Sequence, residues 1–345
     1  RTGLEVKTYP ELPEAIGIRV EGPHHIPFFS KKVVVDRFTA ESVLLGAHVY
    51  SPGIKNCQGI NKNDKVTVVD PLGRAVGSGI VKLCENDILE FRTGLAVQIT
   101  HGIYNIPSFR ESDLYNQGHI YPQSVPAMIT SRVLEPKPGE SIVDLTASPG
   151  GKLSHICQLT NNSCRAIAVD RRAGKIGQTK KTLARLGCSS VIFLLGDSRY
   201  FDLAKDTGCA DRCLVDPPCS ALGLRPKLYD NSTTQKIHAL SNYQKQFVRT
   251  ASRIVRQDGV VVYSVCTMTL EECEMVAKYG IEACGLQLEE PGLWLGRPGL
   301  DRVHPEMLLT QRFDPDIHET GFFIARFRKI RETPSSKGSE VYVNC

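Results

Sequence analysis

SIVDLTASPGGK, residues 141–152, is an apolar run that leads into a turn with one proline and two glycines. The residues after the turn favour a helix, and the same order of apolar strand and helix recurs along the chain. The later strands are RAIAVD (165–170), VIFLLGD (191–197), RCLVDPP (212–218) and GVVVYSVC (259–266). Continuous apolar strands are typical of a parallel sheet with helices on both faces. The sequence therefore predicts an α/β fold with a mostly parallel, doubly wound sheet, closed by ETGFFIARFRKI (319–330) as an antiparallel strand.

The segment before this sheet has a different texture. Five short β-branched runs broken by glycines lie between residues 31 and 102: KKVVVD, GAHVYSPG, DKVTVVD, VGSGIVKL and GLAVQITHG. Such spacing favours a small, mostly antiparallel β-barrel, with TAESVLLGA as a short helix that ends at Gly46. We therefore expect a barrel domain at 31–103, a larger α/β domain at 104–331 and a flexible tail at 332–345.

The composition is that of an ordinary globular protein with room for two domains. The chain has 345 residues, 41% of them hydrophobic and 23% charged, with a net charge of +5. This mild positive charge suits an RNA partner without demanding one. No run of about 18 apolar residues occurs, which argues against a membrane span. The chain begins at Arg1, so we expect an N-terminal part to be missing.

The twelve cysteines include no C-x-x-C pair and no Cys/His spacing of a zinc site. We therefore expect no metal. Most of the thiols are expected to be buried small hydrophobes in a reducing compartment. The expected form is a cytoplasmic monomer.

The turn DLTASPGGK, residues 144–152, is a candidate ligand site. Its two glycines let a backbone approach a ligand closely, although a tight turn without a ligand would look the same. It lacks both the phosphate-binding pattern G-x-x-x-x-G-K-[ST] and the dinucleotide pattern G-x-G-x-x-G. Asp170 ends the second strand, where a carboxylate can accept two ribose hydroxyls, and Asp197 follows the third, placed to reach an adenine amino group. Together these features predict an adenosine-containing cofactor without phosphates.

Two cysteines follow strands that should be neighbours: Cys219 comes after RCLVDPP and Cys266 after VVVYSV. Parallel neighbours end at the same sheet edge, so both thiols are expected beside the cofactor. A thiolate is a strong nucleophile once its pKa is lowered, here by Lys152 and helix N-termini. Its addition to carbon 6 of a cytosine would make carbon 5 able to take a methyl group, while Asp216 holds the N3/N4 edge of the ring. One such cysteine alone would more often be an inert packed residue, but two at this edge favour the chemistry.

These motifs carry a family resemblance. In order, DLTASPGGK, AVD (168–170), GD (196–197), VDPPCS (215–220) and YSVCT (263–267) resemble the motifs of the Nop/Sun family of RNA cytosine-5 methyltransferases. The resemblance covers about residues 104–330, and residues 31–103, with LLGAHVYSPGI, resemble a PUA RNA-binding domain. This arrangement is similar to the sixth human-type branch of the family, which acts on the acceptor end of certain tRNAs.

The resemblance implies a Rossmann-like class I methyltransferase that uses S-adenosyl-L-methionine to methylate carbon 5 of cytosine in RNA, with tRNA as the expected partner. It implies Cys266 as the nucleophile, Cys219 as the cysteine that assists product release, and Lys152 and Asp216 at the cytosine. Residues 1–30 would be the remnant of an N-terminal RNA-binding region. With the strand-end reasoning above, the expected cofactor-binding residues are Thr146, Ala147, Ser148, Pro149, Gly150, Gly151, Lys152, Asp170, Lys175, Asp197 and Asp216.

The chain departs from the family pattern at several positions. Thr146 and Ser148 stand where the family usually has Cys and Ala, and Pro217 and Val265 where it usually has Ala and Thr. Two other functions stay open. DPP followed by an aromatic residue is the motif of amino-group methyltransferases, although a cysteine takes the aromatic position here. A catalytically inactive RNA-binding relic would share the same fold.

Overall fold

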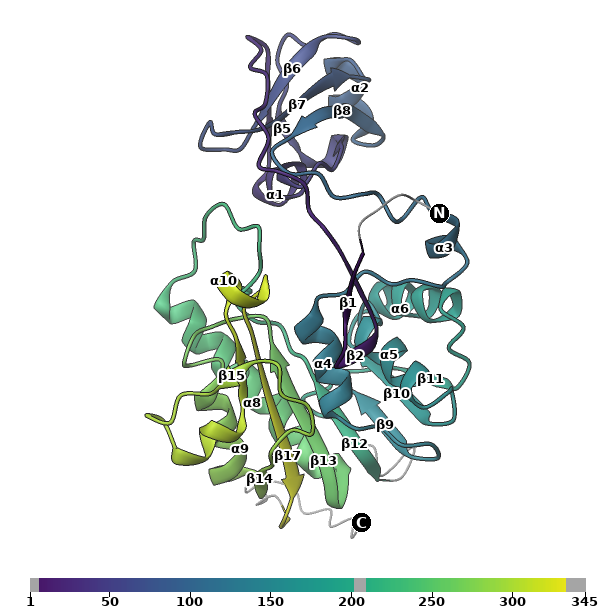
Figure 1. Cartoon of the computed structure of the whole chain (residues 1–345), viewed down its shortest axis with the longest axis vertical. Coiled ribbons are helices and arrows are strands. Elements are labelled where there is room, and N and C mark those ends of the chain that lie inside the picture. The colour runs from purple at the N-terminus through teal and green to yellow at the C-terminus, as the bar shows by residue number, and fades with distance from the viewer. Residues whose placement is uncertain (1–5, 202–208, 333–345) are drawn as a thin grey trace. The chain divides into compact units, whose positions relative to one another are not determined.

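The computed structural model describes residues 6–201 and 209–332, so the expected tail at 332–345 lies, apart from Glu332, outside the described residues. The chain divides into two compact units, both drawn in Figure 1. The first comprises Arg1–Ser108 with Pro226–Asp230, and the second comprises Phe109–Arg225 with Asn231–Cys345. Five residues from far along the chain therefore belong to the N-terminal unit, which no pattern in the sequence indicates.

The second unit is built on a nine-stranded sheet. Its strands are β9 (Ser141–Asp144), β10 (Arg165–Asp170), β11 (Val191–Leu195), β12 (Ala210–Val215), β13 (Val255–Val265), β14 (Leu286–Leu288), β15 (Arg297–Pro298), β16 (Gln311–Phe313) and β17 (Phe322–Lys329). They lie in the order β11-β10-β9-β12-β13-β17-β16-β15, with β14 paired to β17. The first five pair in parallel, and β17 runs antiparallel to β13. The predicted parallel sheet and its antiparallel closing strand are confirmed, while β14, β15 and β16 extend it unpredicted.

Helices pack on the sheet (Figure 1). The helices packed on the strands are α4 (Val125–Val133), α5 (Gly151–Leu159), α6 (Ala173–Arg185), α8 (Thr234–Ile254) and α9 (Glu274–Ala283). The shorter helices of the unit are α3 (Asp113–Asn116), η2 (Pro305–Leu309) and α10 (Pro315–His318). Val143, Ile167 and Val261 form a buried cluster with residues of α8 and α9. Their neighbours Ile142 and Ala166 are also fully buried, although a strand turns alternate side chains to opposite faces. Both faces are therefore covered, which is why these strands are apolar throughout.

The strand order reverses at β9, because β10 lies on one side of it and β12 on the other. In open α/β sheets, ligands bind outside the carboxyl ends of the strands at such a reversal. The turn 145–150 leaves the carboxyl end of β9 and enters α5. The fold thus places DLTASPGGK between the ends of β10 and β12.

The first unit contains a six-stranded sheet in the order β4-β8-β7-β6-β3-β5. Its strands are β3 (Lys32–Val35), β4 (Val49–Tyr50), β5 (Ile54–Asn56), β6 (Lys65–Val69), β7 (Ala75–Val81) and β8 (Leu95–Gly102), preceded by a hairpin of β1 (Val6–Tyr9) and β2 (Leu12–Ile18). Only β3 and β6 pair in parallel, as a mostly antiparallel sheet requires. Helix α1 (Arg37–Leu44) ends just before Gly46, as predicted, and the 3-10 turn η1 (Ser51–Gly53) follows β4.

The β1–β2 hairpin of this unit was not predicted, and neither were one strand and one helix of the segment 31–103. The sequence indicated five strands, and the sixth is β5, whose three residues are IKN. The helix is α2 (Glu85–Phe91), which buries only Ile88 and therefore shows little apolar periodicity.

Ten cysteines in the described residues carry free thiols, and six of them are buried: Cys57, Cys157, Cys164, Cys213, Cys273 and Cys284. Within the same ranges no group of three or more His, Cys, Asp or Glu side chains is arranged to hold a metal. Among the described helices none combines the length and apolar character needed to cross a membrane.

Candidate active site

The pairing of β12 with β13 brings Cys219 and Cys266 together. Cys266 directly follows β13, and the turn DPPC after β12 carries Cys219 to the same edge. The two Sγ atoms lie 3.3 Å apart, close enough for one thiol to donate a hydrogen bond to the other. Both side chains are partly exposed, in contrast to the six buried cysteines.

Lys152 and Asp216 form an ion pair at the same site. Nζ of Lys152 donates to Oδ2 of Asp216 at 2.5 Å, and Oγ of Ser264 donates to Oδ1 at 3.0 Å. The backbone N–H of Asp216 donates to Oγ1 of Thr146 at 3.1 Å. Residues that follow β9 and β12 are thus joined to the carboxyl end of β13 in one hydrogen-bonded cluster. Thr146, one of the departures from the family pattern, anchors the turn that carries Asp216.

The two thiols differ in their electrostatic surroundings. The hydrogen bond from Cys219 lowers the pKa of Cys266 against the opposing effect of burial, and the charge of Lys152 lowers it further. The same hydrogen bond, together with burial, raises the pKa of Cys219 well above its ordinary value. Burial alone would lower the pKa of Lys152, but the Asp216 carboxylate outweighs it and the pKa is raised. Cys266 is therefore the thiol better suited to act as the thiolate.

Asp170 lies at the end of β10 and is only 8% exposed. One of its oxygens accepts from the backbone N–H of Arg172 at 3.0 Å, and the other lies 3.7 Å from Nζ of Lys175. A carboxylate has about four acceptor positions, so these contacts leave capacity for further hydroxyl donors. The residue therefore fits the predicted ribose contact, and Lys175 lies beside it.

Asp197 follows β11 and is held by a neighbour that the sequence analysis did not single out. Arg199 donates from Nε to Oδ1 at 2.9 Å and from Nη2 to Oδ2 at 2.6 Å. These hydrogen bonds hold the pKa of Asp197 below its ordinary value. A contact between Asp197 and an adenine amino group would therefore share the carboxylate with Arg199.

The two glycines in the turn between β9 and α5 are required for different physical reasons. Gly150 has a φ of +108°, a conformation that side chains rarely adopt. At Gly151 a Cβ would lie 2.5 Å from Cε1 of Tyr121, so this glycine makes room for an aromatic ring, which the sequence analysis did not foresee. The backbone N–H of Ala147 donates to the carbonyl of Val169 and ties the turn to β10, while Ser148 and Pro149 complete it.

Besides Arg199, four further polar residues of the site were not predicted from the sequence. Asp144 and Ser264 lie inside the quoted motifs DLTASPGGK and YSVCT, where strand-end position was the available signal. Gln244 on α8 and Glu272 before α9 are fully buried, yet no motif or spacing marks them. Their contacts with the segments that carry the thiols are visible only in three dimensions.

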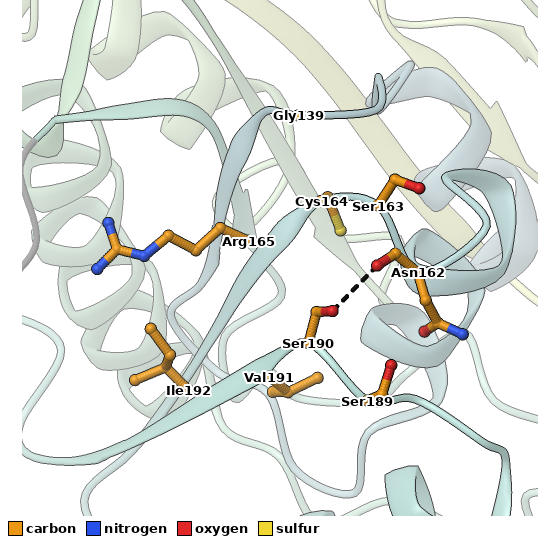
Figure 2. Close-up of a pocket in the computed structure, with 9 residues that line it drawn as sticks. All are labelled: Gly139, Asn162, Ser163, Cys164, Arg165, Ser189, Ser190, Val191 and Ile192. Atoms are coloured by element: carbon orange, nitrogen blue, oxygen red, sulfur yellow. Dashed lines mark hydrogen bonds between the residues drawn. The ribbon is translucent and has the colours of Figure 1, made fainter.

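A separate hollow, shown in Figure 2, lies elsewhere on the same unit. It is lined by Gly139, Asn162, Ser163, Cys164, Arg165, Ser189, Ser190, Val191 and Ile192. These residues precede or begin β9, β10 and β11, so the hollow is at the amino ends of these strands. The thiols and the strand-end carboxylates lie at the carboxyl ends, and the hollow is therefore not part of this site.

Two known protein families match this chain. The model of the 16S rRNA methyltransferase RsmB/F family matches residues 131–328, more than half of the chain. The chain belongs to the RsmB/F family. The model of the PUA domain matches residues 31–103 of this RsmB/F protein. The resemblance to Sun-type enzymes with a PUA domain is thereby confirmed.

Individual relatives of this RsmB/F chain align along nearly its whole length. A tRNA (cytosine(72)-C(5))-methyltransferase of Pyrococcus horikoshii is 39% identical over 338 residues, covering 96% of this chain and 85% of that protein. The tRNA (cytosine(72)-C(5))-methyltransferase NSUN6 of Homo sapiens is 28% identical over 389 residues, covering 96% and 82%. The crystal structure of NSun6 from Pyrococcus horikoshii with SFG has a TM-score of 0.86 at 38% identity, covering 96% and 85%. The predicted Rossmann-like class I methyltransferase fold with a PUA domain is confirmed.

Proposed function

We propose that the protein methylates carbon 5 of a cytosine at the acceptor end of a tRNA, through a covalent bond between Cys266 and carbon 6 that Cys219 helps to break. The chain is an RNA cytosine-C5 methyltransferase, as its family and the activities of its relatives establish. Its cofactor is S-adenosylmethionine, of which the SFG in the similar archaeal structure is an analogue. The proposal adds the site on the RNA and the roles of the two cysteines.

The tRNA substrate is supported by relatives that share both domains. The archaeal and human relatives are both named tRNA (cytosine(72)-C(5))-methyltransferases, and each aligns with 96% of this chain. The PUA domain at 31–103 carries nine Lys and Arg against seven Asp and Glu. With so small an excess of positive charge, it would recognise folded RNA by shape as well as by phosphate contacts.

The residues at the ends of β9, β10 and β11 would hold the cofactor: Asp170 and Lys175 at the ribose, Asp197 at the adenine, and the turn 146–151 alongside. When bound, S-adenosylmethionine supplies a methyl group on a positively charged sulfur. Carbon 5 of cytosine is too weak a nucleophile to take that methyl group unaided, so the chain's own residues must activate it.

The cysteines supply this activation. The Cys266 thiolate adds to carbon 6, and the electron pair of the 5,6 double bond makes carbon 5 nucleophilic. After carbon 5 has taken the methyl group it loses its proton to a base. The C–H electron pair then restores the double bond while the bond from carbon 6 to sulfur breaks, returning Cys266 as thiolate. Cys219, 3.3 Å from Cys266, is positioned to assist this release.

The ion pair of Lys152 and Asp216 has two tasks in this scheme. The Asp216 carboxylate can accept a hydrogen bond from the N4 amino group of the cytosine. Lys152 holds that carboxylate at 2.5 Å, and its positive charge favours the thiolate form of Cys266.

The 3.3 Å contact between the two thiols carries the proposal. An amino-group methyltransferase has a nucleophilic nitrogen in its substrate and needs neither thiol. A non-catalytic relic would have no reason to keep a lowered pKa at Cys266 beside an intact ion pair of Lys152 and Asp216.

Single substitutions of the cysteines test the proposed roles. Cys266→Ala should form no covalent RNA adduct and transfer no methyl group, because nothing adds to carbon 6. Cys219→Ala should still add and methylate, then remain attached to the RNA as a slower band on a denaturing gel. The double variant should behave like Cys266→Ala, because release cannot matter before addition.

The same gels show how the proposal would fail. If Cys219→Ala abolishes the adduct and Cys266→Ala traps it, the two roles are reversed. Full methylation by both variants would exclude the two-thiol mechanism. Tritium from labelled cofactor should appear on cytosine of tRNA, and its appearance on an amino group would support the rival activity instead.

A further inference from the structure

We propose that Glu272, acting with Gln244, is a positioning residue that sets the separation and orientation of the two thiols. This deepens the proposed function and rests on it, since it assigns Cys219 and Cys266 to one reaction. Glu272 lies in the turn between β13 and α9, and Gln244 lies on α8.

Glu272 is a carboxyl group with 0% exposure. Burial of such a group is costly unless hydrogen bonds replace its hydration. Within the described ranges no cation pairs with it; its partners are neutral donors. Oε1 accepts from the backbone N–H of Ser220 at 2.9 Å and from Nε2 of Gln244 at 2.8 Å. Oε2 accepts from Oγ1 of Thr269 at 3.1 Å and of Thr267 at 3.5 Å.

These contacts hold the backbone on both sides of Cys219. On one side, Nε2 of Gln244 donates to the carbonyl of Pro218 at 3.0 Å. On the other, Glu272 accepts from the N–H of Ser220. Gln244 is itself oriented by the hydroxyl of Tyr263, which lies 3.2 Å from its Oε1. The two peptide groups that flank the cysteine are therefore gripped by two side chains that also bind each other.

The same network reaches the residue after Cys266. That residue is Thr267, whose Oγ1 lies 2.7 Å from Oγ of Ser220 and 3.5 Å from Oε2 of Glu272. The residues that follow each cysteine are thus joined directly and through one carboxyl group. A shift of Glu272 would move both thiols relative to each other, and misplacement of reacting groups by about 1 Å can cost about 100-fold in rate.

A buried polar network can also contribute to stability alone. A second buried glutamate in the chain serves as a matched control for a purely structural role of Glu272. Glu274 lies two residues further on, is likewise 0% exposed, and binds Arg312 at 2.5 and 2.7 Å. Within the described residues, the Glu274 carboxylate is hydrogen-bonded to Arg312 and to the backbone N–H of Leu300, and not to either cysteine or the residues that follow them. Glu272→Gln and Glu274→Gln therefore alter similarly buried carboxyl groups of which only one holds the thiols.

The test compares Glu272→Gln, Glu272→Leu and Gln244→Leu with Glu274→Gln in the full chain, at a temperature where circular dichroism shows each to be folded. Methylation of tRNA gives kcat and KM. In parallel, dibromobimane, which fluoresces after it bridges two thiols, reports their separation, with the Cys219–Cys266 cross-link identified by peptide mapping.

We expect kcat to fall about 10- to 100-fold in Glu272→Leu and Gln244→Leu, with KM for tRNA within twofold of the parent. Cross-linking should slow in the same variants. Glu272→Gln keeps one acceptor oxygen and should recover part of both rates. Glu274→Gln should lower the melting temperature while kcat and cross-linking stay near the parent values.

Parent rates of kcat and cross-linking in the folded Glu272 and Gln244 variants would overturn the positioning role, as would a rise in KM at constant kcat. The methylation and cross-linking measurements also separate this inference from the proposed function. If the parent protein methylates no RNA, the proposed function fails, and unequal cross-linking between the Glu272 and Glu274 variants still decides whether Glu272 positions the thiols.

Discussion

At the scale of single residues, the site contains a buried carboxyl group that is hard to ionise. Asp144 at the end of β9 is 2% exposed, and burial raises its pKa from 3.8 to about 7, with Asp216 and Asp170 adding to the effect. Between pH 3.8 and about 7 the folded protein keeps a proton that the unfolded chain has lost. The folded state is therefore favoured most at low pH and loses this contribution as the pH rises to about 7.

Asp144→Asn should remove this pH dependence, because asparagine is neutral at every pH and keeps the acceptor for the N–H of Thr146. Relative to the parent, the variant should gain stability steadily from pH 4 to 7, on the order of 4 kcal/mol in total, and no more above it. Urea unfolding of both proteins across that range measures the difference. A constant difference at all pH values would show that Asp144 ionises normally in the folded protein.

At the scale of elements, backbone hydrogen bonds join the loop between β12 and α8 to the end of β13 and to the start of β17. The N–H of Gly223 donates to the carbonyl of Cys266 at 3.1 Å, and its carbonyl accepts from the N–H of Gly321, just before β17, at 2.7 Å. A Cβ on Gly223 would lie 2.0 Å from the carbonyl oxygen of Gly321. Only glycine fits where these two backbones meet.

Gly223→Ala should therefore destabilise the protein, by about 1–3 kcal/mol, because backbone cannot move aside as a side-chain end can. Gly177→Ala on α6 is the control: its Cβ would meet nothing within 4 Å, and alanine should add up to about 1 kcal/mol through helix propensity. Thermal melting of the two variants should give shifts of opposite sign. Equal stability of Gly223→Ala and the parent would contradict the close approach.

At the scale of the whole molecule, the segment Pro226–Asp230, which follows Cys219 in the sequence, belongs to the N-terminal unit. Nη1 of Arg37 donates to the carbonyl of Tyr229 at 2.9 Å, and the N–H of Leu228 donates to Oε1 of Glu41 at 3.0 Å. Leu228 also packs against the apolar core of that unit. The first unit therefore includes five residues that lie between β12 and α8 in the sequence, and Arg37 and Glu41 of α1 bind them.

Arg37→Ala should release this segment, because it removes the hydrogen bond to Tyr229 and the contact with its ring. Hydrogen exchange should become several-fold faster at residues 226–230 and stay unchanged in α6. Lys55→Ala, which removes an exposed cation from the same unit, should leave exchange in both places at the parent rate. Unchanged exchange at 226–230 in Arg37→Ala would show that the anchor lies elsewhere.

Sequence reasoning predicted the strands β9 to β13 and β17 of the large sheet, together with the candidate site residues at their carboxyl ends. Apolar periodicity is a local property of the sequence. Strands with apolar residues on both faces are buried by helices that cover both faces of a parallel sheet. Asp170, Asp216, Cys219 and Cys266 could be named in advance because each lies at or just beyond the carboxyl end of a recognisable strand.

The contacts of these residues depend on the tertiary structure. Glu272 and Gln244 reach the Cys219 loop across 52 and 26 residues of sequence, and the partners of Arg37 lie near residue 229. A polar residue carries no sign of a distant partner, because its hydrogen bonds are satisfied equally well by water until folding removes the water. Burial selects the partner, and burial belongs to the whole fold.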